Sequence, residues 1–183
     1  MISIRNITAL AAALAFSCTV SLAQAKFTGV KMCGACHKQE KTGATYTKWE
    51  KSAHAGAYKT LLSEKANALA KEKGLKKPAA ESAECLECHV TGGGAATNVE
   101  KTFAKEEGVT CEACHGAASG YKTIHSKPEN KDKSMAAGLV KGNKEDAAPC
   151  KKCHNEKSPT FKGFTMAEYW AKIAHNLPAK TTK

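Results

Sequence analysis

The chain has 183 residues and a formal net charge of +11, and only 6% of its residues are aromatic. Every positive residue after Arg5 is a lysine. Because arginine provides the bidentate contacts with which proteins read phosphates and bases, this composition argues against a nucleic-acid-binding protein. Beyond the N-terminal segment, no stretch approaches the roughly 20 apolar residues of a membrane span, so none is expected.

Residues 1–25 are typical of a secretory signal peptide. Arg5 provides the charged start, residues 7–16 form an apolar run, and Ala23-Gln24-Ala25 matches an A-x-A cleavage site. We therefore expect export to the periplasm, or beyond it to the extracellular space, and a single mature domain of residues 26–183. A lipoprotein anchored at Cys18 is the alternative, but the residues before Cys18 fit that processing pattern poorly.

A Cys-x-x-Cys-His motif occurs four times, which is the attachment signature of c-type haem. Residues at i, i+3 and i+4 share one face of a helical turn, so two thiols can reach the porphyrin vinyl groups while the imidazole reaches the iron. One Cys-x-x-Cys also suits a zinc knuckle, a redox dithiol or half of a disulfide pair, but four copies favour four covalently attached haem c groups. The attachment residues are Cys33, Cys36, Cys85, Cys88, Cys111, Cys114, Cys150 and Cys153, and the proximal iron ligands are His37, His89, His115 and His154.

Between the first two motifs the sequence predicts two helices. Residues 42–52 carry Tyr46 and Trp49 on one side, with His54 just beyond. Residues 57–73 form the second helix, which ends at Gly74. Its apolar stripe predicts packing rather than function and comprises Leu61, Leu62, Ala66 and Leu69.

The later connections are expected to be irregular until the last helix. The glycine run within residues 91–96 and the polar segment 126–148 both predict loops. The final helix is predicted from Thr165 to about His175, with Thr165 as N-cap, Glu168 closing a capping box, and Phe164 against Tyr169 as a hydrophobic staple. We expect a mainly α protein with much irregular chain, in which porphyrins form the core of a compact multihaem cytochrome c.

Counting histidines limits the iron coordination. Seven histidines are present and four belong to the motifs, so only His54, His125 and His175 remain as distal ligands. Four haems would need four distal histidines, and at least one iron therefore has another ligand or an open position. Met32, Met135 and Met166 are the alternative ligands, but none has a feature that marks it as one, and an open or water-bound iron is the better interpretation.

The chain resembles the cytochrome c-554 family of tetrahaem periplasmic cytochromes. The resemblance lies in Trp49-Glu50-Lys51-Ser52-Ala53-His54-Ala55, in Glu107-Gly108-Val109-Thr110 leading into the third motif, and in the closing Ile173-Ala174-His175. It implies an electron-transfer protein with closely stacked haems, three bis-histidine and the second five-coordinate. Carried over by the order of motifs, it pairs His125 with His37, His54 with His115, and His175 with His154, and leaves His89 alone.

The leading hypothesis is an exported electron carrier rather than an enzyme. Lysine point charges suit reversible docking on acidic surfaces of a protein donor and acceptor, although they also serve simply to solvate the surface. An alternative is reduction of a small nitrogen oxide such as nitric oxide at the open haem on His89. A conductive filament of stacked subunits is a further alternative, although this chain is one histidine short of full bis-histidine ligation.

Overall fold

The computed structural model describes residues 24–94 and 97–175 as a mainly α protein with much irregular chain. The expected signal peptide, apart from its last two residues, and Cys18 lie outside these ranges. Within them there is no β-strand, and one isolated parallel bridge joins Phe27 and Val99. The α-helices are α1 (Val30–His37), α2 (Thr45–Glu50), α3 (Ala57–Thr60), α4 (Glu64–Glu72), α5 (Ala83–His89), α6 (Cys111–His115), α7 (Lys131–Ala136), α8 (Ala148–Lys151) and α9 (Met166–Ile173).

Short 3-10 helices occupy several of the connections. They are η1 (Glu40–Thr42), η2 (Ala79–Glu81), η3 (Thr91–Gly93), η4 (Lys105–Glu107), η5 (Ala118–Gly120) and η6 (Pro128–Asn130). None of the helices in the described ranges is long and apolar enough to cross a membrane.

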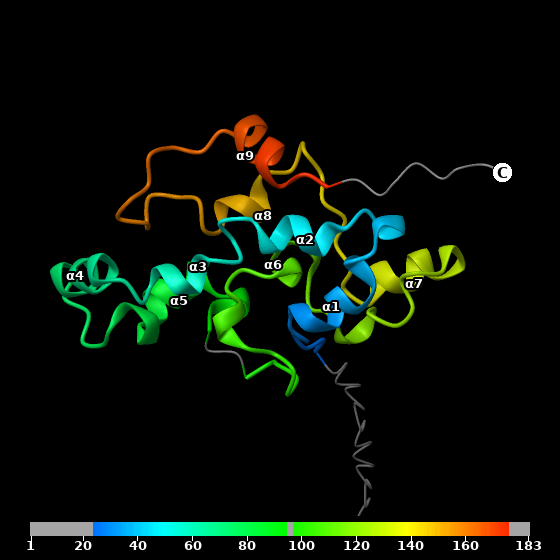
Figure 1. Cartoon of the computed structure of the whole chain (residues 1–183), viewed down its shortest axis with the longest axis horizontal. Coiled ribbons are helices and arrows are strands. Elements are labelled where there is room, and N and C mark those ends of the chain that lie inside the picture. The colour runs from blue at the N-terminus through cyan, green and yellow to red at the C-terminus, as the bar shows by residue number, and fades with distance from the viewer. Residues whose placement is uncertain (1–23, 95–96, 176–183) are drawn as a thin grey trace, which may run out of the picture.

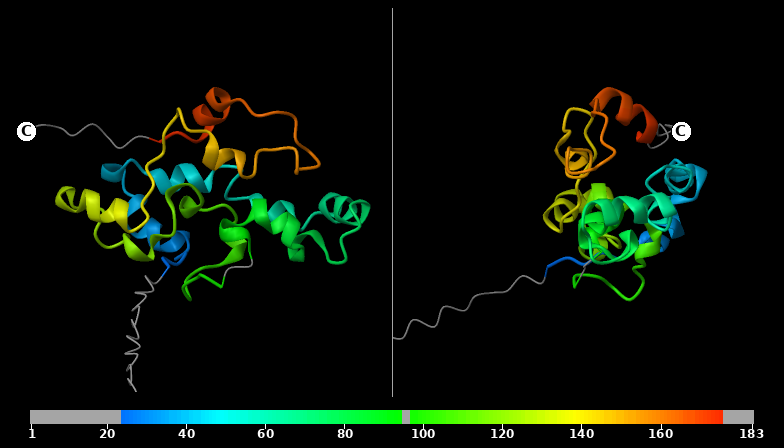
Figure 2. Two further views of the ribbon diagram at one scale, coloured as in Figure 1. Left: turned by 180° about the vertical axis from the view of Figure 1, so that it is seen from behind. Right: turned by 90° about the vertical axis from the view of Figure 1, so that its left-hand side faces the viewer.

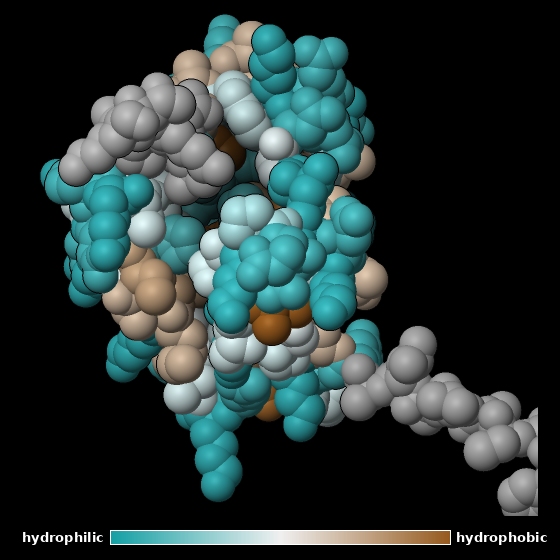
Figure 3. All heavy atoms as spheres, turned by 90° about the vertical axis from the view of Figure 1, so that its right-hand side faces the viewer, coloured by the Kyte–Doolittle hydropathy of each residue, from teal (hydrophilic) through white to brown (hydrophobic). Residues whose placement is uncertain are grey.

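The molecule is elongated, with α4 at one end of its longest axis and α7 at the other (Figure 1). Helices α8 and α9 lie along one long side, and the views from behind and from the end show the same arrangement (Figure 2). The face seen in Figure 3 is covered mainly by hydrophilic residues, with only scattered hydrophobic ones between them.

Conventional side-chain packing is concentrated in one lobe, which we call the α3–α5 lobe (residues 57–90). There α3 and η2 pack against α5, and α4 packs against η2. The buried side chains of this core are Tyr58, Leu61, Ala70, Ala79, Ala80, Leu86 and Val90. The lobe therefore packs directly against the second haem motif, because Leu86 lies between the two cysteines of that motif.

The single helix predicted over residues 57–73 is wrong, because the chain forms α3 and α4 with a break between them. Ser63 has extended backbone and its hydroxyl accepts a hydrogen bond from the Ala66 amide, which makes it the N-cap of α4. The break turns Leu62 outward, where it is 59% exposed, while Leu61 remains buried. The predicted end of the helix is confirmed, since Gly74 follows it at a φ of 71°.

One other helix prediction and one loop prediction also need correction. The helix expected at residues 42–52 covers only Thr45–Glu50, although Tyr46 and Trp49 do pack together with ring centres 5.4 Å apart. The segment 126–148, expected as a loop, contains η6 and α7, where the buried Ser134 hydroxyl donates to the Asn130 carbonyl. Polar composition therefore concealed a short helix. The glycine run, expected as a loop, contains the 3-10 turn η3, although Gly92, Gly93 and Gly94 all have positive φ.

The last helix begins where the sequence predicts but is secured differently. Phe164 and Tyr169 make the expected hydrophobic staple, with ring centres 4.7 Å apart. The predicted capping box is wrong, since the Thr165 side chain makes no capping hydrogen bond. The helix ends at Ile173, so His175 follows it on extended chain instead of being carried on its last turn.

Candidate haem-binding site

The four Cys-x-x-Cys-His motifs lie on short helical turns. The first three end α1, α5 and α6, and the fourth begins in α8, after which the His154 amide still donates to the Cys150 carbonyl at 2.9 Å. None of the eight cysteines of the motifs forms a disulfide bond in the described part of the chain. Each motif therefore places two thiols and one imidazole on one turn, the arrangement needed to attach a haem c covalently.

Six histidines stand in three pairs. The ring centres are 6.0 Å apart for His37 and His125, 6.1 Å for His54 and His154, and 5.9 Å for His115 and His175. Two imidazoles on opposite sides of one iron, each with a metal–nitrogen bond of about 2 Å, have ring centres roughly 6 Å apart. Each pair joins one motif histidine to one histidine from elsewhere, so the protein fits three bis-histidine haems.

Hydrogen bonds from Nδ1 to backbone carbonyls orient three of the histidine rings in the haem sites. The Nδ1 atoms of His89 and His115 lie 2.8 Å from the carbonyls of Ala57 and Val140, and that of His125 lies 3.0 Å from the Tyr121 carbonyl. Since a carbonyl only accepts, Nδ1 must carry the proton in each ring. That tautomer leaves the lone pair on Nε2, the nitrogen required for iron, and the hydrogen bond also fixes the orientation of the ring.

Burial keeps several of the histidines in the neutral form that binds metal. It lowers the pKa of His54, which the neighbouring His154 lowers further. Burial also lowers the pKa of His37, His115 and His154. Because only an uncharged imidazole can coordinate iron, these shifts favour ligation at neutral pH.

The motifs approach one another in a definite order. Cys33 and Cys111 are close enough that their interaction raises the pKa of the first thiol and lowers that of the second. Cys150 adds to the rise in the pKa of Cys114, after burial. Burial and then Cys88 raise the pKa of Cys153 to about 12. Numbered along the chain, the motifs are therefore neighbours in the order first, third, fourth, second.

The histidine partners differ from those that the family resemblance implied. His125 does pair with His37, but His54 pairs with His154 and His175 with His115, the reverse of the expected assignment. The reason lies in α9, whose first residues pack on His154, with the Tyr169 ring centre 4.9 Å away. From Tyr169 the helix runs on for about 6 Å to Ile173, and His175, two residues beyond, meets His115 of the neighbouring third motif.

His89 has no ring partner of this kind among the described residues, although its Nδ1 is held by the Ala57 carbonyl. All three non-motif histidines are taken by the other pairs. The second motif therefore offers one axial ligand and no histidine opposite it. The histidine count required at least one such motif, and the family resemblance implied that it is the second.

Two carboxylates that the sequence did not reveal, the buried Glu112 and the half-buried Glu107, hold the first and third motifs together. Glu112, 2% exposed, accepts hydrogen bonds from the amides of Thr28, Gly29 and Ala118 at 2.8–3.0 Å. Glu107 accepts from the Val30 amide at 2.8 Å, while its other oxygen is buried without a partner. Because Glu112 lies inside the third motif, these hydrogen bonds hold the segment just before α1 against α6.

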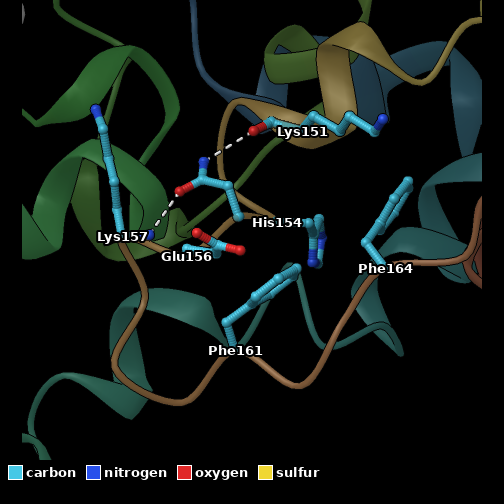
Figure 4. Close-up of a pocket in the computed structure, with 7 residues that line it drawn as sticks. Lys151, His154, Glu156, Lys157, Phe161 and Phe164 are labelled. Atoms are coloured by element: carbon cyan, nitrogen blue, oxygen red, sulfur yellow. Dashed lines mark hydrogen bonds between the residues drawn. The ribbon is translucent and has the colours of Figure 1, made fainter.

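A surface pocket of about 420 Å³ beside His154 tests whether the surroundings suit a haem. The rings of Phe161 and Phe164 stand on two sides of His154, and Lys151 and Lys157 line the same pocket (Figure 4). A porphyrin needs apolar walls for its ring and positive charge near its propionates. The pocket supplies both, so the residues around the fourth motif fit the group.

Comparisons with known proteins agree with this site. Residues 32–116, which contain the first three motifs, match the family described as cytochrome c554 and c-prime. The chain is 35% identical over 112 residues to cytochrome c-554 of Nitrosomonas europaea, a match covering 57% of this chain and 44% of that protein. It therefore spans less than half the length of that relative, and no solved structure matches it. Together, the family match and the haem-attachment motifs support the cytochrome c-554 family for this chain.

Proposed function

We propose that the protein is an exported tetrahaem electron carrier of the periplasm, a single domain of residues 26–183 with three bis-histidine haems and one five-coordinate haem. The observation that carries the proposal is the set of three histidine pairs with ring centres about 6 Å apart. Each attached haem supplies a one-electron Fe(III)/Fe(II) couple. No acid, base or nucleophile is needed for this role.

The protein's own contribution is to hold the ligands and the order of the motifs. Carbonyl acceptors fix the Nδ1 protons of His89, His115 and His125, so these rings need little reorganisation when the iron changes charge. The packing of α1 against α6 and of α6 against α8, and the approach of the Cys153 Sγ to the Glu87 carbonyl at 4.0 Å, support a continuous series of haems. Several electrons can then be held and passed on one at a time.

The partners in this proposal are redox proteins with acidic surfaces. Lysine is the only cation after Arg5, and lysine charges raise the rate of association without locking the complex. Electron exchange with an acidic donor should therefore slow as ionic strength rises, because salt screens exposed charges. A rate that does not change between low and high salt would remove this part of the proposal.

The test begins with the mass of the mature protein, which should equal the chain from Lys26 plus four haems. His54→Ala, His125→Ala and His175→Ala should each convert one low-spin haem to high spin in the electron paramagnetic resonance spectrum. Fewer than four haems contradicts the cofactor count. A substitution that leaves the spectrum unchanged removes that histidine from the ligand set.

A second candidate function is binding and reduction of nitric oxide at the haem on His89. It is favoured by one observation, the absence of a histidine opposite His89 among the described residues. The oxidised protein should then show one high-spin haem whose signal changes when nitric oxide is added. A wholly low-spin spectrum that is indifferent to the gas would eliminate this candidate.

A further inference from the structure

One four-residue segment, residues 54–57, bears on two different haem sites. His54 is the partner of His154 in the fourth site, with ring centres 6.1 Å apart. The Ala57 carbonyl accepts the Nδ1 proton of His89, 2.8 Å away, in the second site. The segment is a tight turn, since the Ala57 amide donates to the His54 carbonyl at 3.2 Å. Any shift of the turn therefore moves a ligand of one haem and the hydrogen-bond partner of another.

The turn is docked on Gly108 and Val109. The Val109 amide donates to the His54 carbonyl at 3.0 Å. The Trp49 indole donates to the Val109 carbonyl at 2.8 Å, and the Thr91 amide donates to the Gly108 carbonyl at 3.0 Å. The two residues are thus fastened to α2, to the chain after α5, and to the turn itself.

Gly108 is the residue at which this segment comes close to the backbone of residues 54–57. A Cβ atom there would lie 2.7 Å from the His54 carbonyl oxygen and 3.1 Å from that of Ala55. Both neighbours are backbone atoms, so no side chain could swing aside to make room. Gly108 also has a φ of 70°, in the left-handed region that favours glycine.

We propose that Gly108 is a positioning residue for two haems. Because glycine has no side chain, the segment before α6 can pack directly against residues 54–57. This contact orients His54 toward the fourth site and the Ala57 carbonyl toward His89. This role rests on the proposed haem ligation and extends it. Gly108 lies outside every motif, yet it would set the geometry of the ligands at both the fourth and the second haem.

The experiment compares Gly108→Ala with Gly74→Ala in the full haem-loaded protein. Gly74 has nearly the same φ, 71°, but a Cβ there would meet no atom within 4 Å. The two variants therefore share the backbone strain and differ in the steric contact. Gly108→Ala should add a high-spin signal of up to one haem per molecule, as His54→Ala does. It should also shift the iron–histidine stretching frequency of the reduced haem on His89, which reports the hydrogen bond at Nδ1.

Gly74→Ala should match the wild type in both spectra. The inference is overturned if Gly108→Ala gives wild-type spectra, or if both variants change equally. If Gly108→Ala does not fold, Trp49→Phe is the second test of the inference. It removes the hydrogen bond to the Val109 carbonyl and should add a smaller high-spin fraction. A wild-type spectrum of this variant overturns the inference. A wild type without four haems and three low-spin centres contradicts the proposed function instead, so the two failures are distinguishable.

Discussion

The α3–α5 lobe and the rest of the described chain, which we call the haem body, are stabilised in different ways. The lobe buries a continuous set of apolar side chains, among them Leu61 at 4% and Leu86 at 7% exposure. The haem body holds three of the four motifs, and its best-buried side chains include the polar Glu112, Thr28, Thr110 and Ser134. The lobe therefore contains its own core, whereas the haem body is built for a core of porphyrin.

The largest expected effect comes from removing the haems. Replacing all eight motif cysteines with serine should leave helical protection in the α3–α5 lobe and abolish most of it in the haem body. The reason is that only the lobe retains enough buried apolar contacts without cofactor. Hydrogen exchange followed by mass spectrometry measures this by peptide. Equal loss of protection in residues 57–90 and 111–175 would contradict the distinction.

Glu112→Gln should destabilise the haem body by about 2–4 kcal/mol. The amide has only one acceptor oxygen, whereas both carboxylate oxygens accept backbone amides, so at least one buried amide loses its partner. Denaturant unfolding of the haem-loaded protein measures the change. Glu106→Gln, at an exposed position on the same stretch of chain, is the control and should be neutral.

Leu61→Ala should cost about 2–3 kcal/mol in the lobe, since it removes a buried side chain and leaves a cavity. The neighbouring Leu62→Ala is a matched control, because that side chain is 59% exposed and its loss should change stability by less than about 0.5 kcal/mol. Similar effects of the two substitutions would show that the lobe core is not packed as described.

The smallest expected effect is a dependence on pH at Glu107. Burial raises the pKa of this carboxyl, although the Val30 amide and Lys31 oppose the rise. The folded state thus holds its proton to higher pH than the unfolded chain does, and this contribution to stability is lost as pH rises through the folded pKa. Glu107→Gln should therefore gain stability relative to wild type between pH 4 and pH 7, by a few degrees in Tm at most. A difference in Tm that is constant over this range contradicts the prediction.

The sequence predicts which residue types form the site better than it predicts which histidines pair with each other. The motif spacing identifies the thiols and proximal histidines, and counting leaves only three distal candidates. Which distal histidine meets which motif depends on how far α9 carries His175 beyond His154, and no spacing rule states that distance. For this reason the structure pairs His54 and His175 the other way round from the family analogy.

The sequence predicts local structure correctly where the signal comes from neighbouring residues. The prediction is wrong where a polar side chain makes hydrogen bonds inside the protein. The staple of Phe164 and Tyr169 needs only neighbouring residues, and it is present. Ser63 lies within an apolar stripe that predicts a continuous helix, yet its hydroxyl accepts a hydrogen bond from the Ala66 amide and caps the start of a new helix. Glu112 looks like any surface acid in a highly charged chain, because only the folded backbone brings the three amides to it.

The place of Glu112 within its motif has a wider consequence. The four motifs are chemically interchangeable, but the residue that follows the first cysteine differs in each: Gly34, Leu86, Glu112 and Lys151. Gly34 lies under the Tyr46 ring, Leu86 enters the lobe core, Glu112 grips the chain before α1, and Lys151 lines an open pocket. The residue after the first cysteine, which the motif leaves free to vary, thus makes a different contact in each of the four motifs and helps to place each of them in the fold.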